Sequence, residues 1–487
     1  MELNSQLTSI LDSLRYLIPE GILVLLMFGV LTLGLFTNIK SFLIYKTLVG
    51  VSYCLTGITL LVNWPDYPQE LFNGMLRLDD FSSYFKLLFL AGGLVTVLIS
   101  RPHRHSSEYF VLQLAIVLGS CLLAMSLNFV MVVLSLELIS LSSYLLAGFS
   151  EDSKSAEGSL KYFLFGTVAT AIMIYGLSLV YGLTGTLDFS SNQFADTLIA
   201  THPALFIIAA VMVMVGLLFK VSAVPLHLWT PDVYESAPTP VVAFFSVVPK
   251  LAGFAVLIRL VLAFHLFGQS GYYWPELIGL IALFSIVIGN VSALTQTNPK
   301  RMLAYSSIAQ SGFMLLGVTS LTLEGIQYTL FYASVFLIMN FLVFSVLNDY
   351  EDQGVNEIPA FSGLGRSSWF PAVALLVGMV ALTGLPPTAG FTGKLLIFSS
   401  LWNTYQESGS SLLLVLFVAG LINTVVSLFF YLKIPYFLFL KEAPAGVPQK
   451  SSVAGNLFHL LLVLLLIYLF LQPAVLMGWI NRITFVL

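Results

Sequence analysis

The sequence predicts an all-α, polytopic membrane protein, and three observations support this class. Of the 487 residues, 58% are hydrophobic and only 9% are charged, whereas about 25% are charged in soluble domains. Apolar runs of about 20 residues recur from end to end, and each can cross a hydrocarbon core of roughly 30 Å. The alternation over about ten residues that is typical of transmembrane β-strands does not occur.

We predict about fourteen transmembrane helices, with boundaries uncertain by a few residues. They lie near 17–36, 42–62, 80–99, 109–126, 128–149, 160–183, 203–236, 239–264, 275–297, 300–320, 324–348, 367–403, 411–440 and 456–479. The first run is followed by further spans rather than by a cleavage site, so we expect a retained helix. The loops between the runs are short and leave no room for a second, soluble domain.

The basic residues predict the orientation of the chain. Alternate loops contain 12 of the 20 basic residues, namely Lys40, Lys46, Arg101, Arg104, Lys154, Lys161, Lys300, Arg301, Arg366, Lys433, Lys441 and Lys450. The opposite side has about five, namely Arg15, Arg77, Lys86, Arg259 and Arg482. The positive-inside rule makes the richer side cytoplasmic and places both termini on the outer side.

Two predicted spans, 203–236 and 367–403, are longer than one crossing requires. The first contains Pro225, and the second contains Gly384, Pro386, Pro387 and Gly390. Proline removes a backbone donor and clashes with the preceding turn, so we predict two half-helices around an unwound stretch in each span. The two spans are five apart, and an odd offset reverses the direction of crossing. This is the pattern of an inverted repeat of five helices plus five.

The predicted repeat gives four regions. Residues 1–108 would form three accessory helices, and residues 109–264 would form the first antiporter-like half. Residues 275–440 would form the second, inverted half, and residues 441–487 would contain the last helix.

Four charged residues lie deep inside predicted spans, away from the span ends, namely Glu137, Lys220, Lys250 and Lys394. At 1.5 Å per residue, Glu137 and Lys250 lie roughly 14–15 Å deep. A charge at the bilayer centre costs about 2.5–3.5 kcal/mol on insertion scales, so these groups should face the interior of the bundle. A structural ion pair with snorkelling lysines is the simpler alternative. Snorkelling accounts for Lys86 and Arg259 near span ends, but not for a lysine as deep as Lys250.

The functional interpretation of the four buried charges is a proton relay. Removal from water disfavours the charged form of an ionisable side chain, and a nearby opposite charge restores it. A carboxylate such as Glu137 could therefore charge a lysine by approaching it and discharge it by withdrawing. Lysines bridged by water would pass protons along the membrane.

Four further residues are possible members of the relay, and each has an alternative role. His227 could link two stations, since imidazole titrates near neutral pH, or it could be a hydrogen-bonding cap at the helix break. Ser306 and Ser307 could hold water, or they could join helices. Asp232 could feed in protons with Glu235, or both could form a solvated helix end.

The sequence suggests neither a metal site nor a redox centre in this chain. Cys54 and Cys121 lie far apart and outside any CxxC pattern, and the six histidines are scattered. Of the histidines, only His227 is expected to be buried. We therefore expect no cofactor in this chain, and no nucleic-acid partner.

Four segments resemble a known family. They are FKVSAVPLHLWTPDVYESAPTPV at 219–241, PKLAGFAVLIRL at 249–260, NPKRMLAYSSIAQSGFMLLG at 298–317 and GLPPTAGFTGKL at 384–395. They resemble the antiporter-like membrane subunits of proton-pumping NADH:quinone oxidoreductase (complex I), over roughly residues 110–440. Ser236 departs from the glycine that is usual there. The length of the chain and Lys394 most resemble the branch called subunit N.

The resemblance implies roles for the matching residues. Glu137 and Lys220 would be the charge pair of the first half-channel, Lys250 the central connector and Lys394 the terminal lysine of the second half-channel. NADH, FMN, iron–sulfur clusters and quinone would belong to partner subunits. The partners would be other membrane subunits, including further antiporter-like ones, together with lipid, water and protons. The membrane would be an energy-transducing one, such as the bacterial inner membrane.

Two other functions are compatible with these residues. One is a subunit of a Na⁺/H⁺ antiporter, whose members are similar in sequence. The other is a passive membrane scaffold, which would not require the buried Glu137 and Lys220.

Overall fold

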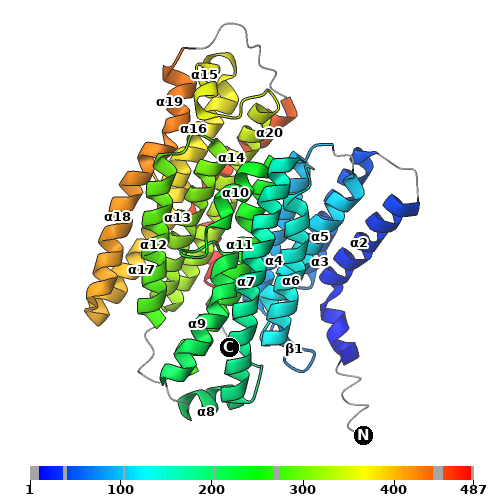
Figure 1. The fold of residues 1–487 in the computed structure, drawn as a ribbon, viewed down its shortest axis with the longest axis vertical. Helices are drawn as coiled ribbons and strands as arrows, with labels where there is room; N and C mark the ends of the chain where they lie inside the picture. The colour runs from blue at the N-terminus through cyan, green and yellow to red at the C-terminus, as the bar shows by residue number, and fades with distance from the viewer. Residues whose placement is uncertain are drawn as a thin grey trace. The chain divides into compact units, whose positions relative to one another are not determined.

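The computed structural model describes residues 10–36, 41–102, 105–150, 152–200, 203–267, 274–442 and 453–483. Of the basic residues that orient the chain, Lys40, Arg104 and Lys450 lie outside these ranges. The described residues divide into two compact units, each built mainly from helices (Figure 1). The first unit contains the chain up to Val221 and the part of α11 from Val248 onward. The second contains Ser222–Val247 and the helices from α12 to α21.

The first unit is helical apart from one short hairpin (Figure 1). Its helices are α2 (Ile18–Phe36), α3 (Phe42–Val62), α4 (Asp80–Ile99), α5 (Ser106–Met125), α6 (Phe129–Ala147), α7 (Ser153–Thr184), α8 (Asn192–Ala200), α9 (Pro203–Lys220) and the later part of α11 (Thr239–Phe267). Strands β1 (Gln69–Leu71) and β2 (Leu76–Leu78) pair antiparallel between α3 and α4. This hairpin was not predicted from the sequence.

The second unit contains α10 (Trp229–Ser236) and the beginning of α11, followed by helices in chain order. They are α12 (Trp274–Leu294), α13 (Pro299–Thr319), α14 (Leu323–Glu351), the 3₁₀ helix η1 (Ile358–Phe361), α15 (Leu364–Ser367), α16 (Trp369–Thr383), α17 (Ala389–Ser408), α18 (Ser411–Tyr431), α19 (Lys433–Leu440), α20 (Val453–Leu471) and α21 (Pro473–Ile480). Within this unit α14 packs against α16, α17 and α20.

The predicted class, an all-helical polytopic membrane protein, is confirmed. Among the described residues, 12 helices are long and apolar enough to cross a membrane. The two overlong segments supply the shorter apolar helices Ala204–Lys220 and Trp369–Thr383. Together these account for the fourteen predicted spans. Both segments are broken, at 221–228 and at 384–388. Gly390 lies in the first turn of α17 rather than in the break.

The helix starts follow from polar residues at the N-cap. Asp79 accepts a hydrogen bond from the Ser82 backbone N–H and forms a capping box with it at the start of α4. At the starts of α6 and α7, the Asn128 side chain accepts from the Val130 N–H and the Asp152 side chain accepts from the Ser155 N–H. Asn298 caps α13, and Pro299 then occupies the first helical position, where a missing N–H costs nothing.

Small residues allow the closest helix pairs to form within each unit. On α7, a Cβ added at Gly176 would lie 2.9 Å from the Ala209 carbonyl oxygen of α9. On α12, a Cβ at Gly289 would lie 2.7 Å from the Ala309 backbone nitrogen of α13. Hydrocarbon offers no hydrophobic driving force between helices, so backbone contact of this kind supplies the packing energy.

Two basic residues that were expected to snorkel are instead buried in ion pairs, so that prediction was wrong. The Lys86 Nζ lies 2.7 Å from Glu20 Oε1, and both side chains are at most 4% exposed. The Arg259 Nη2 donates to both oxygens of Asp79, at 2.7 and 2.9 Å, and its Nε donates to the Ala124 carbonyl at 3.0 Å. The guanidinium also lies over the Phe81 ring, 4.8 Å from its centroid.

The compact units do not follow the four regions predicted from the sequence. The first broken segment is divided at Val221, and Ser222–Val247 groups with the later helices because α10 packs on α13. The predicted halves, 109–264 and 275–440, rest on sequence spacing and direction rather than on compactness.

The buried ion pair of Arg259 with Asp79 predicts a specific effect on stability. Arg259→Met leaves the Asp79 carboxylate buried without its cation, and breaking a buried pair costs about 3–5 kcal/mol. We expect the variant protein to aggregate at a clearly lower temperature in detergent. The measurement is the fraction of this protein that stays soluble after heating.

The matched control is the double variant Asp79→Asn/Arg259→Met. Asparagine keeps the N-cap of α4 but removes the unpaired charge, so heat resistance should recover in part. Equal loss of heat resistance in the single and double variants would contradict a stabilising role of the Arg259–Asp79 ion pair.

Candidate functional site

The first candidate group lies in the first unit, where α6 meets the end of α9. Lys220 is the last residue of α9, 2% exposed, and its Nζ lies 3.2 Å from the Ser140 hydroxyl of α6. Glu137 precedes Ser140 by one turn on α6, so both point to the same side of that helix. Glu137 is half-buried and lies within electrostatic range of Lys220. Among the described residues, the two make no ion pair within 4 Å.

Lys250 lies in the part of α11 that belongs to the same unit. It is fully buried, at 0% exposed. One turn later on α11, Gly253 faces the stem of Lys220: an added Cβ would lie 3.4 Å from Lys220 Cβ and 2.8 Å from Val221 Cγ1. The glycine therefore lets α11 approach the end of α9 closely. The structure brings Glu137, Lys220 and Lys250 into one region of the first unit, as the sequence predicts.

Lys394 lies in the second unit and is held by the second helix break. Its Nζ donates to the Thr383 carbonyl at 2.8 Å and to the Leu382 carbonyl at 3.3 Å. These are the last two carbonyls of α16, which have no partner within the helix and carry the negative end of its dipole. The Phe313 ring of α13 lies 4.2 Å from the ammonium. Among the described residues no carboxylate pairs with Lys394.

The chain turn at Gly384 makes this arrangement possible. Gly384 has φ of 86°, a left-handed conformation, and its N–H donates to the Val380 and Ala381 carbonyls. An added Cβ would lie 2.7 Å from Lys394 Cδ. The turn leaves the carbonyls of Leu382 and Thr383 for Lys394, and only glycine fits both the backbone and the lysine.

A hydrogen-bonded network continues from the same carbonyl. Gln310 of α13 donates to the Leu382 carbonyl at 2.8 Å and to the Tyr431 hydroxyl at 2.9 Å. The Tyr431 hydroxyl is also bonded to Ser306, and the Tyr332 hydroxyl donates to the Gln310 side-chain oxygen. Ser306 thus joins α13 to α18. Gln310 is the centre of the network. The roles of Tyr332 and Tyr431 were not predicted from the sequence.

Ser307 and His227 lie outside this network. Ser307 is buried on α13 beside the Tyr234 hydroxyl of α10. His227 lies in the first break, where its ring bonds to the Pro225 backbone. The ring does not cap α10, since Leu228 occupies the N-cap without a side-chain bond. Its Nδ1 is buried with no hydrogen-bond partner in the part of the chain that the structure describes.

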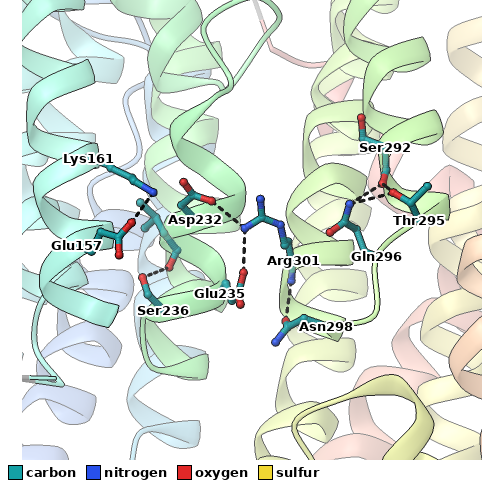
Figure 2. Close-up of polar contacts among 11 residues, drawn as sticks. Glu157, Lys161, Asp232, Glu235, Ser236, Ser292, Thr295, Gln296, Asn298 and Arg301 are labelled. Atoms are coloured by element: carbon teal, nitrogen blue, oxygen red, sulfur yellow. Dashed lines mark hydrogen bonds and ion pairs between the residues drawn. The ribbon is translucent and has the colours of Figure 1, made fainter. Parts of the chain in front are cut away.

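The acidic end of α10 is neutralised by the start of α13 (Figure 2). The Arg301 Nη1 donates to Asp232 Oδ1 at 2.8 Å and to Glu235 Oε2 at 2.9 Å. Asp232 and Glu235 are about a third exposed, so they form neither a fully solvated helix end nor a buried station. Lys300 binds Glu351 at 2.9 Å and the Ala237 carbonyl at 3.0 Å.

This geometry can now be compared with known proteins. The family described as "NADH:quinone oxidoreductase/Mrp antiporter, TM" matches residues 126–423. NADH-quinone oxidoreductase subunit N of Anaeromyxobacter sp. is 42% identical, over 79% of this chain and 79% of its own. Subunit N 2 of Chloroherpeton thalassium is 38% identical, over 92% of this chain and 90% of its own. The chain belongs to the subunit N family of NADH:quinone oxidoreductase.

Solved structures agree with this assignment. A chain of respiratory complex I from Thermus thermophilus with bound aureothin is 31% identical, with a TM-score of 0.80, over 95% of this chain and 99% of that one. A chain of the Mrp complex from Dietzia sp. has a TM-score of 0.83 but 19% identity, so it shows the fold alone. This subunit is therefore an integral membrane component of complex I, and its antiporter-like fold is shared more widely.

One prediction about the histidines of this subunit N chain was wrong. His459 of α20 is 1% exposed, so His227 is not the only buried histidine among the described residues. The His459 Nε2 lies 3.7 Å from Asp349 Oδ2. Near the same end of α14, Glu351 accepts hydrogen bonds from Lys300 and Thr239. Among the described residues, no three histidine, cysteine or acidic side chains come together as metal ligands.

The Lys394 arrangement predicts that Gly384→Ala impairs this subunit N. The left-handed conformation costs an alanine about 1–2 kcal/mol, and its Cβ would also displace the lysine stem. We expect proton pumping by the purified complex in proteoliposomes to fall severalfold, while the subunit still co-purifies.

Gly409→Ala is the matched control. Gly409 also has a left-handed φ, 66°, at the end of α17, but an added Cβ meets nothing within 4 Å. It should carry the backbone strain without the loss of pumping. Similar losses in both variants would refute a specific role for the Lys394 position.

Proposed function

We propose that this complex I subunit translocates protons through Glu137, Lys220, Lys250 and Lys394. The family assignment makes the chain a proton-translocating membrane subunit of NADH:quinone oxidoreductase. The single observation that supports these residues is that Lys220 and Lys394, both at helix breaks, contact neutral groups rather than carboxylates in the described structure. A lysine held this way can lose its proton without leaving a buried counter-charge.

Glu137 would control the charge of Lys220. The carboxylate lies within electrostatic range but without direct contact, one turn from the serine that receives the ammonium. Approach of Glu137 would favour the charged lysine, and withdrawal would favour the neutral one. Lys250, near Gly253 and the Lys220 stem, would take the next step within the first unit.

Lys394 would be the corresponding station of the second unit. The carbonyls of Leu382 and Thr383 stabilise its charged form through the helix dipole. Gln310, Tyr431 and Ser306 extend hydrogen bonds away from the same carbonyl. Hydroxyl groups can both donate and accept, so this network could carry a proton onward. Ser307, His227 and Asp232 would contribute further groups to this relay.

The finer assignments follow from the sequence and the family. We propose that residues 109–264 and 275–440 form two inverted halves, with both termini on the outer side of a bacterial inner membrane. NADH, FMN, iron–sulfur clusters and quinone would be held by partner subunits. Further antiporter-like subunits and lipid would surround this chain.

A subunit of a Na⁺/H⁺ antiporter is the second candidate, because the description of the matching family also names the Mrp antiporter. Purification of the native complex, with identification of its subunits, decides between the two. Flavin and iron–sulfur subunits should co-purify with this chain. A complex without them would overturn the oxidoreductase assignment.

The relay predicts that Lys220→Ala and Glu137→Ala each lower proton pumping by about tenfold or more, since positioned proton-transfer groups contribute at least this much. The measurement is proton uptake by proteoliposomes during NADH oxidation. Co-purification of the other subunits shows that the complex assembles.

Lys161→Ala is the control for loss of a lysine. Lys161 pairs with Glu157 at 2.7 Å and is 39% exposed. An exposed pair of this kind contributes about 0.5 kcal/mol or less. Full pumping in assembled Lys220→Ala and Glu137→Ala complexes would instead support a passive scaffold.

A further inference from the structure

A second set of buried ionisable groups lies among α2–α5 in the first unit, apart from the lysines of the relay. Its centre is the pair of Glu20 on α2 and Lys86 on α4, with a separation of 2.7 Å and exposures of 4% and 1%. Glu20 lies in the first turn of α2, where the helix dipole favours a carboxylate. Lys86 lies six residues into α4, or about 9 Å along it.

The pair lacks the hydrogen bonds that normally accompany a buried ion pair. Among the described residues, Glu20 Oε1, Glu20 Oε2 and Lys86 Nζ have no partner in hydrogen-bond geometry. Taking two charges out of water costs several kcal/mol per ion, and their attraction offsets this only when other hydrogen bonds satisfy the remaining positions. The protein thus presents a charged pair with open donor and acceptor positions.

Three hydroxyl groups near the pair are also buried without a partner in the described residues, namely those of Tyr53, Thr56 and Ser83. Ser83 precedes Lys86 by three residues, on the same side of α4. On α3, a Cβ at Gly50 would meet Val97, and Tyr53 packs on Gly93 of α4. Helices α3 and α4 therefore run antiparallel, and Thr56 lies about one turn closer to Lys86 than Tyr53 does.

Cys121 of α5 links these groups. It is 2% exposed and lies within electrostatic range of Glu20, Lys86 and Tyr53. Tyr109, which lies near the start of α5, also acts on Tyr53 and bonds to Ser100 at 3.0 Å. Four helices therefore contribute polar side chains to this region. We name Glu20, Tyr53, Thr56, Ser83, Lys86 and Cys121 the α2–α5 cluster.

We propose that the α2–α5 cluster is a hydrated proton-exchange site, additional to the relay lysines. Buried polar groups without protein partners are usually satisfied by ordered water, which bonds two to four of them. Water bridging Thr56, Ser83 and the ion pair would satisfy the open positions. A metal cation does not fit, because the single carboxylate already faces an ammonium.

The proton chemistry of the pair is balanced in each of three steps, which connect four protonation states. Transfer from Lys86 Nζ to Glu20 gives a neutral amine and a carboxylic acid, with no net charge change. Uptake of one proton by that state gives an ammonium and a carboxylic acid. Release of one proton from the ion pair gives an amine and a carboxylate. The pair can therefore hold or release one proton, and the three accessory helices α2–α4 then take part in proton exchange.

Cys121 provides the test, because only its thiolate reacts with a thiol reagent. The purified complex carries Cys54→Ser, which removes the exposed thiol of α3. Methyl methanethiosulfonate is applied between about pH 6 and pH 9, a range that covers the titration of perturbed amines and carboxyl groups. Mass spectrometry of the Cys121 peptide gives the rate at each pH.

The control for a dry site is Leu114→Cys in a background that also carries Cys121→Ser. Position 114 lies seven residues earlier on the same side of α5 and is equally buried, at 0% exposed. A hydrated cluster should make Cys121 react about tenfold faster or more than Cys at this position. Equal rates would overturn the proposal.

The pH dependence of the Cys121 reaction rate tests whether the Glu20–Lys86 pair exchanges protons. The logarithm of the wild-type rate should rise with pH as the thiolate fraction grows, with one change of slope where the ion pair gains or loses its proton. Either Glu20→Gln or Lys86→Met should remove this change of slope, and the use of two variants guards against failure of one to assemble. A wild-type profile without a change of slope would show a permanently charged structural pair and would overturn the proposal.

Discussion

A charge inside the bilayer must find its polar partners within the protein, and the arrangement of this subunit follows from that constraint. Hydrocarbon offers neither water nor counter-ions, so each buried charge is costly unless the bundle supplies them. The structure uses two solutions. Arg259 and Lys86 are matched by the carboxylates of Asp79 and Glu20. Lys220 and Lys394 are instead held by a hydroxyl and by backbone carbonyls.

These two solutions separate stability from function. A guanidinium held by a carboxylate, a carbonyl and an aromatic ring fixes α4, α5 and α11 in place, because no part of it can be released cheaply. An ammonium held by carbonyls is charged only as long as the surrounding field favours it. The same residue type can therefore be a fixed clamp or an exchangeable station, depending on its partners.

The helix breaks provide the neutral partners. An intact helix uses nearly all of its carbonyls internally, whereas a helix end leaves several without partners. The break at Gly384 places the carboxyl end of α16 at membrane depth. Lys394, on the following helix α17, then donates a hydrogen bond to the Thr383 carbonyl at that end. Gly390 lets α17 start against α16, because an added Cβ would overlap the Ala381 carbonyl oxygen. Gly384 and Gly390 are thus part of the site.

The ion pairs at the helix ends have a different role. Arg301 joins the end of α10 to the start of α13, and Lys300 joins both to Glu351 of α14. These pairs are partly exposed and individually weak. Their effect is to fix where the second half of the broken span meets its neighbours, which places Tyr234 beside Ser307.

The sequence by itself determined the fold class, the spans, both helix breaks and the deep charges, because length, apolarity, proline and charge cost act locally along the chain. Motifs around Lys220, Lys250, Ser306 and Lys394 also indicated the family. Only the tertiary structure decided the partners: Ser140 for Lys220, two carbonyls for Lys394, and Glu20 and Asp79 for the basic residues expected to snorkel. Partners lie on other helices, and the sequence does not specify which faces of those helices meet.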